Sequence, residues 1–459
     1  MDIPQLLTQL EPWAQRIEEW DDVPRIYYNL DSDAIIAATI FARVFLDLEK
    51  PCQLTPIGNN WRITDELKKK PSIFLGISNE LIESVSDFEN AIILPNISDV
   101  QHLDDENTNI LKLEHWLEND DKITLSAIAY FLCNPIAKSL DYIVRLPLIS
   151  YIAKFGIRSF EGVHEMICKD AIDGDIAEFQ KRFIFLGSQI FTIPELLEYS
   201  QYPFLPGLSG NESNVTTLLA KSGIELTRGN ETRYIQDLSK QETTELNTKL
   251  VMFMSSQKGH QEDEMVFIRD VIVFKDEEKK GLTSNSLDFG RCIIDGINRK
   301  QIGNLCSVLI GNRGSKLIQL QKLFVEERKA ISVSFQIIRD HEGEVEDLGG
   351  LRVYNADRKV SWYNASLTSG MALSNGLVKP DKPFAVVSPG PNDKQTIGFR
   401  ASKSHKIGDG LVSIIQSALL QSDYSATLNG TKLSATVIID KSISRELLLS
   451  VNKKLVELS

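Results

Sequence analysis

The chain has 459 residues, of which 42% are hydrophobic and 25% are charged, and its formal net charge is −13. This composition is typical of a globular protein and excludes a disordered one, and the length predicts two or three domains. The negative charge argues against broad, sequence-independent affinity for nucleic acid, because that affinity comes from Lys and Arg side chains that displace counterions from phosphates.

The sequence contains no sign of export or of a membrane segment. It does not start with a basic segment followed by an apolar core, and its apolar runs are too short to span a bilayer. Its five cysteines include no CxxC pair, which predicts reduced, buried thiols and neither disulfides nor zinc ligands. We therefore expect a cytoplasmic protein.

The first hundred residues alternate helical and strand patterns. Residues 4–20 carry apolar side chains at helical spacing, and the β-rich run at 26–28 leads through Asp31 and Asp33 into an alanine-rich helical segment. Three more apolar runs follow, at 52–57, 72–77 and 91–94. Continuous apolar strands that alternate with helices indicate a parallel sheet covered on both faces.

Asp31 and Asp33 follow the first strand, at the end of a sheet where open α/β proteins bind ligands. Their carboxylates suit a divalent cation, but a hydrolytic site with two metal ions needs further Asp or His ligands from other strands. The alternative is that they cap the free N–H groups of the following helix. We favour the capping role over weak binding of a single metal ion.

The rest of the chain predicts a helical region and then a second α/β domain. Residues 110–198 are mostly helical, the Pro-, Gly-, Asn- and Ser-rich segment 203–231 is interpreted as a loop or boundary, and 287–333 as two or three basic helices. Strand and helix patterns alternate after residue 350, with strands at 351–354, 384–387, 396–400 and 432–439 and helices at 366–374, 410–421 and 445–458. The predicted domains are 1–200, α/β; 201–330, a helical linker or insertion; and 331–459, a smaller α/β domain.

Three segments resemble the DHH phosphoesterases, and among them the archaeal RecJ-like proteins. LDSDAIIAATI, at 30–40, is similar to the first family motif, in which a His and two Asp surround a turn glycine. Residues 287–312 are similar to the family's linker, and SLTSGMAL, DKPFAVV, GFRASKSH and LSATVIID follow the order of its substrate-binding domain. The resemblance implies a parallel-sheet DHH-type domain, a helical linker and a DHH-associated α/β domain.

Most acids and imidazoles of the family's motifs are replaced in this chain. Asn29 stands in place of the first motif's histidine and Ala34 in place of its glycine. The positions of the other metal ligands hold Gly76, Pro95, Asn96, Ile97 and Ile157, and Asn429 and Gly430 replace the phosphate-binding loop. Proline and isoleucine side chains cannot ligate a metal. We therefore expect no catalytic residue, no metal and no cofactor, with Asp31 and Asp33 as vestigial motif residues.

Other candidate features are weaker. The six histidines have no metal-ligand spacing and are expected at the surface or the edge of the core. The GNRG segment at 311–314 has the pattern of a nucleic-acid-binding KH loop, but a helix-to-helix turn is preferred. Arg400, in GFRAS, matches the place where the family's substrate-binding domain offers an arginine to phosphate, and it is our candidate for phosphate or nucleic-acid contact.

The resemblance implies a catalytically inactive relative, similar to the cell-division-cycle forty-five subunits of the CMG replicative helicase. Such a protein is a DNA replication factor at replication forks on the nucleoid, a scaffold that binds the GINS complex and the MCM helicase and binds single-stranded DNA weakly. The region 203–280 has the weakest family-like pattern and is our candidate docking region. The alternatives are an active metal-dependent single-strand exonuclease or phosphoesterase of the DHH family, and a nucleic-acid-binding module without activity.

Overall fold

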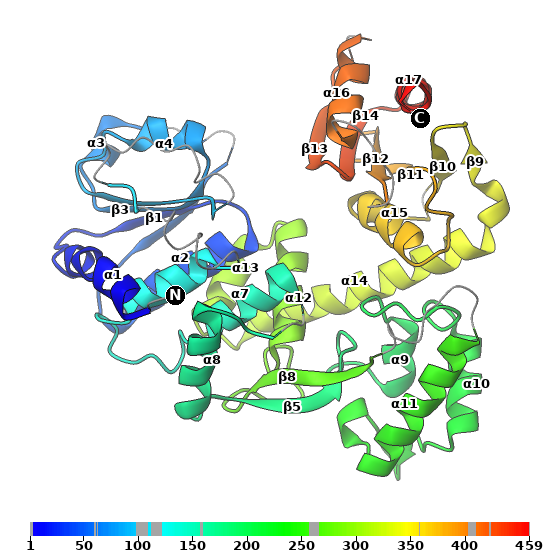
Figure 1. Ribbon diagram of the computed structural model, residues 1–459, viewed down its shortest axis with the longest axis horizontal. Helices are drawn as coiled ribbons and strands as arrows, with labels where there is room; N and C mark the ends of the chain where they lie inside the picture. Colours follow the sequence, from blue (N-terminus) through cyan, green and yellow to red (C-terminus); the bar gives the residue numbers. More distant parts are fainter. Residues whose placement is uncertain are drawn as a thin grey trace. The chain divides into compact units, whose positions relative to one another are not determined.

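The structure is a computed structural model, shown in Figure 1, and it forms two compact units. It describes residues 3–58, 61, 63–97, 109–111, 122–156, 159–256, 266–357, 359–402, 410–421 and 424–458. One unit comprises residues 1–182 and 269–324, and the other comprises residues 183–268 and 325–459. The division into three domains at residues 200 and 330 stays a prediction.

The first unit contains a four-stranded sheet in the order β2-β1-β3-β4, and all neighbouring strands are parallel. The strands are β1 (Arg25–Tyr28), β2 (Gln53–Pro56), β3 (Ser72–Ile77) and β4 (Ala91–Pro95). The helices nearest to them are α1 (Ile3–Glu18), α2 (Ser32–Asp47), α3 (Asp65–Lys68) and α4 (Asn79–Val85). Figure 1 shows α3 and α4 over one face of the sheet and α1 and α2 over the other, which confirms the predicted covered parallel sheet.

Further helices of the first unit pack on α2 or on the helices that contact it. They are α6 (Leu125–Cys133), α7 (Arg145–Phe155), α8 (Val163–Asp173), α12 (Ser286–Asn298) and α13 (Ile302–Leu309). The strands β5 (Ala177–Phe183) and β8 (Ile268–Phe274) form a two-stranded sheet. Helix α2 is buried almost all round because α6 and α7 pack on it, and this explains why its sequence is apolar on every side. No helix in the described ranges is long and apolar enough to cross a membrane.

The long helix α14 (Ser315–Asp340) runs from the first unit into the second, whose first part is helical. This part contains α9 (Ile193–Glu198), α10 (Glu212–Ser222), the two-residue strands β6 (Thr227–Arg228) and β7 (Glu231–Thr232), and α11 (Lys240–Ser255). The interpretation of 203–231 as a loop is therefore wrong over α10. Asn211 caps this helix, buried Val215 and Leu219 follow at helical spacing, and Gly223 ends it in a left-handed conformation, so the polar composition concealed a short amphipathic helix.

The second unit also contains a six-stranded mixed sheet in the order β13-β14-β12-β11-β10-β9. Its strands are β9 (Glu346–Asp347), β10 (Arg352–Asn355), β11 (Phe384–Pro389), β12 (Lys394–Arg400), β13 (Thr427–Thr431) and β14 (Ser434–Asp440). Helices α16 (Leu411–Gln421) and α17 (Ser444–Glu457) pack on one face, and α15 (Ala365–Ser374) packs on the other. The α/β fold class is confirmed, whereas β9 and β13 were not predicted.

Candidate functional site

Asp31 lies directly after β1 and caps α2. One oxygen of its carboxylate, Oδ1, accepts hydrogen bonds from the backbone N–H groups of Asp33 and Ala34, at 3.0 and 2.9 Å. Its backbone is extended, as a helix N-cap requires. The local sequence therefore folds as the capping alternative predicts.

Asp33 lies in the first turn of α2 and is buried, with 4% of its surface exposed. Oδ1 accepts hydrogen bonds from the N–H of Ser126 and the hydroxyl of Ser150, both at 2.9 Å. Oδ2 accepts one from the N–H of Leu125 at 2.9 Å and lies 3.4 Å from Nζ of Lys154. The carboxylate therefore holds the N-terminus of α6 and one side of α7 to α2, and its charge is balanced by a helix N-terminus and an ammonium group.

This arrangement was not predicted, because the partners of Asp33 lie 92 to 121 residues away in the sequence. One local signal was present: Ser150 and Lys154 are four residues apart in a helical segment, so they share one helix face. A polar stripe on an otherwise apolar helix indicates a buried polar partner, but it does not identify that partner.

The neighbouring strand ends do not supply metal ligands. Gly76 has a φ of +67°, and a Cβ there would lie 3.1 Å from Ala34 Cβ, 3.2 Å from a methyl group of Leu125 and 3.4 Å from Asp31 Oδ2. Strand β4 ends at Pro95, and the N–H of Asn96 donates to the carbonyl of Ile77.

Of the other replaced positions in the first unit, Asn29 is exposed and Ile157 lies outside the described residues. No group of three or more His, Cys, Asp or Glu in the described ranges is arranged to hold a metal ion. A two-metal centre does not fit the side chains at this strand edge, because Asp33 is fully engaged and apolar atoms surround Gly76.

His164, on α8, is fully buried, and so the expectation that the histidines lie at the surface or core edge is wrong for this residue. Its Nε2 lies 2.9 Å from the hydroxyl of Thr124, which caps α6, and its ring packs on Tyr151. Burial lowers the pKa of His164 to about 4, although the negative charge of Asp33 acts in the opposite direction. The imidazole is therefore neutral at pH 7 and supports the same helix end that Asp33 holds.

Burial raises the pKa of Asp31 to about 6, from an ordinary value of 3.8, and the charge of Asp33 adds to the rise. Because the folded pKa lies above the unfolded one, Asp31 favours folding most below pH 3.8, and this contribution is lost as the pH rises through 6. Replacing Asp31 by Asn keeps the cap and removes the buried charge. We expect Asp31→Asn to raise the free energy of unfolding by about 1–2 kcal/mol at pH 7.5, with the gain vanishing towards pH 4.

Urea unfolding of the wild type and Asp31→Asn across this pH range measures the effect. A variant that is less stable than the wild type at pH 7.5, or a difference that does not change with pH, would contradict this account of Asp31.

Arg400, at the end of β12, lies in a different part of the chain, in the second unit. Its Nε donates to the carbonyl of Ser366 at 3.2 Å, and its side chain lies over Gly370 of α15. It lines a pocket of about 440 Å³. The other lining residues are Tyr202, Leu367, Gly370, Met371, Leu373, Ser374, Ala401, Ser402 and Leu433. Burial lowers the pKa of Arg400, but a guanidinium group stays charged at neutral pH.

Three of the basic side chains between residues 291 and 329, those of Arg291, Arg313 and Lys329, form ion pairs with acids in the described part of the chain. Arg313 binds the buried Glu277, which also accepts a hydrogen bond from Arg145 at 3.1 Å. Arg291 pairs with Asp295 at 3.1 Å. The GNRG segment at 311–314 connects α13 to α14, so it is the expected helix-to-helix turn.

Comparisons with known proteins agree with this architecture. Residues 185–268 match the family model of the DHH-CID domain, and no curated protein sequence matches the chain. This match overlaps the region 203–280. The expectation that this region has the weakest family-like pattern is therefore wrong.

Among solved structures, CDC45 from Entamoeba histolytica has 13% sequence identity and a TM-score of 0.66, over 98% of this chain and 99% of that one. RecJ from Thermus thermophilus in complex with Mn²⁺ has 12% identity and a TM-score of 0.53, over 98% of this chain and 55% of that one. Exonuclease RecJ bound to manganese has 12% identity and a TM-score of 0.52, over 97% of this chain and 94% of that one.

At these identities the likeness concerns the fold. The parallel sheet with its acidic helix cap and the DHH-CID match point to the same architecture. The chain has a RecJ-like DHH fold that resembles that of CDC45.

Proposed function

We propose that this protein is a non-catalytic DNA replication factor, a RecJ-like scaffold that binds GINS and MCM and activates the replicative helicase. The observation that carries the proposal is the engagement of Asp33. In a fold shared with RecJ, the carboxylate that follows the first strand is bound by two backbone N–H groups and a hydroxyl, with an ammonium group 3.4 Å away. The CDC45 likeness, which covers nearly all of both chains, supports the same proposal.

The chemistry of phosphodiester hydrolysis explains why this engagement matters. A metal-dependent nuclease generates its nucleophile from metal-bound water and needs several carboxylate oxygens free to coordinate the ions. Asp33 has none free for a metal, and the Lys154 ammonium near it repels a divalent cation. Of the four carboxylate oxygens of Asp31 and Asp33, Oδ2 of Asp31 is left to coordinate a metal ion. A single oxygen is insufficient for a pair of metal ions.

We place the GINS-binding surface in the DHH-CID region, residues 185–268. On α11, Leu246, Leu250 and Met254 are buried, whereas Met252 projects outward with 63% of its surface exposed. Methionine is adaptable and recurs at binding surfaces. An exposed methionine on a helix that is held by one buried side suits a docking surface in which buried apolar area supplies most of the affinity.

Co-purification with the tagged full chain tests the proposal. GINS and MCM subunits should be enriched, and Met252→Lys should reduce the recovery of GINS by tenfold or more. Leu449→Lys, at a 47% exposed leucine on α17, is the matched control and should bind as the wild type does. If GINS is not enriched with the wild type, the scaffold proposal fails; equal recovery with Met252→Lys removes only the assigned surface.

Weak binding of single-stranded DNA through Arg400 is the second part of the proposal. The half-buried guanidinium in an otherwise uncharged pocket suits a single phosphate. Fluorescence anisotropy with a labelled single strand at low salt should show binding that Arg400→Gln weakens and that added salt abolishes. Equal affinity of the variant and the wild type would remove Arg400 from the proposal.

A further inference from the structure

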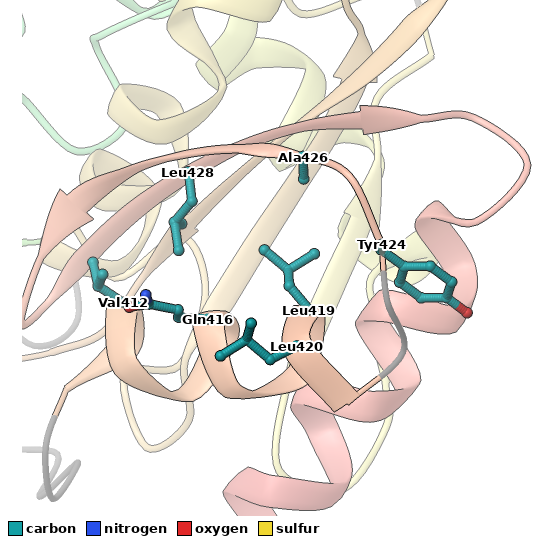
Figure 2. A pocket seen from close by; sticks show the side chains of 7 residues that line it. All are labelled: Val412, Gln416, Leu419, Leu420, Tyr424, Ala426 and Leu428. Carbon is teal, nitrogen blue, oxygen red and sulfur yellow. The ribbon is translucent and has the colours of Figure 1, made fainter.

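A groove with an uncharged lining lies on the second unit between α16 and the edge strand β13. Its volume is about 410 Å³, and Figure 2 shows Leu428 pointing from the strand towards α16, where Leu419 and Leu420 lie. The remaining lining residues are Val412, Gln416, Tyr424 and Ala426, so the lining contains no charged side chain. Leu420 is 76% exposed, the highest value among the large apolar side chains in the described ranges.

The strand beside this groove lies at an end of the six-stranded sheet. In the described part of the chain, β13 pairs with one strand, β14, and forms an end of the six-stranded sheet. Proteins usually protect such an edge with lysine, proline or an inward-facing charge. The sequence of β13, TLNGT, contains none of these, so its outer backbone groups suit another extended strand.

We propose that this edge and groove bind a second copy of the chain by antiparallel pairing of the two β13 strands about Asn429. In this register Thr427 pairs with Thr431 of the second copy, and Asn429 pairs with its own equivalent. Leu428 lies opposite Gly430, which has no side chain to contact the leucine. The five residues are therefore complementary to themselves on both faces of the strand.

The charges at the two ends of the groove favour the same arrangement. Lys432 lies at the β13–β14 turn. Its carbonyl accepts a hydrogen bond from the N–H of Leu411, at the N-terminus of α16. The lysine charge and the helix N-terminus together make this end of the groove positive. At the other end Glu446 accepts a hydrogen bond from Tyr424, beyond the C-terminus of α16, so this end is negative. Antiparallel pairing brings the positive end of each copy beside the negative end of the other.

The paired surface is smaller than the roughly 800 Å² per partner of a stable interface, so we expect a dissociation constant on the order of 10–100 μM. Sedimentation of the full chain from about 1 to about 200 μM in low salt should show a monomer–dimer equilibrium in this range. Leu420→Lys should weaken it at least tenfold, whereas Leu46→Lys, at a 55% exposed leucine on α2, should leave it unchanged. Thermal unfolding of each variant verifies that it is folded.

Three further variants test the register. Lys432→Glu should weaken the dimer several-fold, and adding Glu446→Lys should restore it. Asn429→Cys should form an intermolecular disulfide on oxidation, because the Cβ atoms of directly opposed residues in an antiparallel pair approach to about 4.5 Å, which a disulfide can bridge. A chain that stays monomeric at the highest concentration overturns the proposal, as does a dimer that Leu420→Lys does not affect. Binding of a different protein to the groove of a monomeric chain overturns it equally.

Discussion

Replacing Asp33 by alanine should lower the free energy of unfolding by about 3–5 kcal/mol. The change removes the acceptor for the N–H groups of Leu125 and Ser126 and for the Ser150 hydroxyl, and it leaves the Lys154 ammonium without its nearby carboxylate. Buried donors that lose their acceptor each cost about 1–3 kcal/mol. Urea unfolding at pH 7.5, followed by circular dichroism, measures the loss.

Asp31→Asn is the matched control, since it changes the other carboxylate of the same motif and keeps the helix cap. It should be at least as stable as the wild type at this pH. An Asp33→Ala protein within about 1 kcal/mol of the wild type would mean that the carboxylate does not hold α6 and α7, and that it is available for chemistry.

Replacing Gly398 by alanine should also destabilise the protein strongly, by about 3 kcal/mol or more. Gly398 lies in β12 beneath the start of α15, and a Cβ there would lie 2.1 Å from the backbone N of Ser366 and 2.3 Å from the carbonyl carbon of Ala365. Backbone atoms cannot move aside as a flexible side chain can, so α15 must shift from the sheet. Thermal unfolding measures the loss.

Gly303→Ala, in α13, is the control for this substitution. Apart from the backbone of its own helix and its chain neighbours, no described atom lies within 4 Å of a Cβ at that position, and the helix favours alanine, so stability should stay unchanged or rise by up to about 1 kcal/mol. Because Ser366 also accepts the hydrogen bond from Arg400, any Gly398→Ala protein that folds should have an altered Arg400 pocket. Equal stability of the Gly398→Ala protein and the wild type would show that the sheet and α15 are not in this close contact.

Periodicity predicted the elements with strong local signals. The apolar run at 72–77 is β3 to the residue, and the strand at 384–387 and the helix at 366–374 agree closely with β11 and α15. Local chemistry was equally informative at Asp31, where an acidic residue before a helix acts as its cap.

Elements and contacts without a strong local signal were not predicted. β13 has the sequence TLNGT, in which Asn and Gly disfavour a strand, and it is extended because it pairs with β14, the next strand along the chain. The role of Asp33 depends on residues around 125 and 150, and the burial of His164 depends on the packing of α8. A single sequence contains the residues of such a cluster but not the contacts between them.

The central claim is that the acidic motif of this RecJ-like fold is structural. A motif residue that stabilises the fold can outlast the loss of its metal site, because replacing Asp33 would leave several buried donors without an acceptor. A structural role explains why the chain has Asp31 and Asp33 although the neighbouring strand ends hold Gly76 and Pro95 and supply no metal ligand. The fold that contains them resembles those of CDC45 and a manganese-bound exonuclease.

The most direct test is a cleavage assay of the purified full chain with labelled single-stranded DNA and RNA, in the presence of manganese or magnesium. Asp31→Asn is the appropriate variant, since it should fold as the wild type does, whereas Asp33→Ala should be strongly destabilised. We predict no metal-dependent cleavage by either the wild type or Asp31→Asn. Robust cleavage by the wild type that requires the metal ion and disappears in Asp31→Asn would contradict the account.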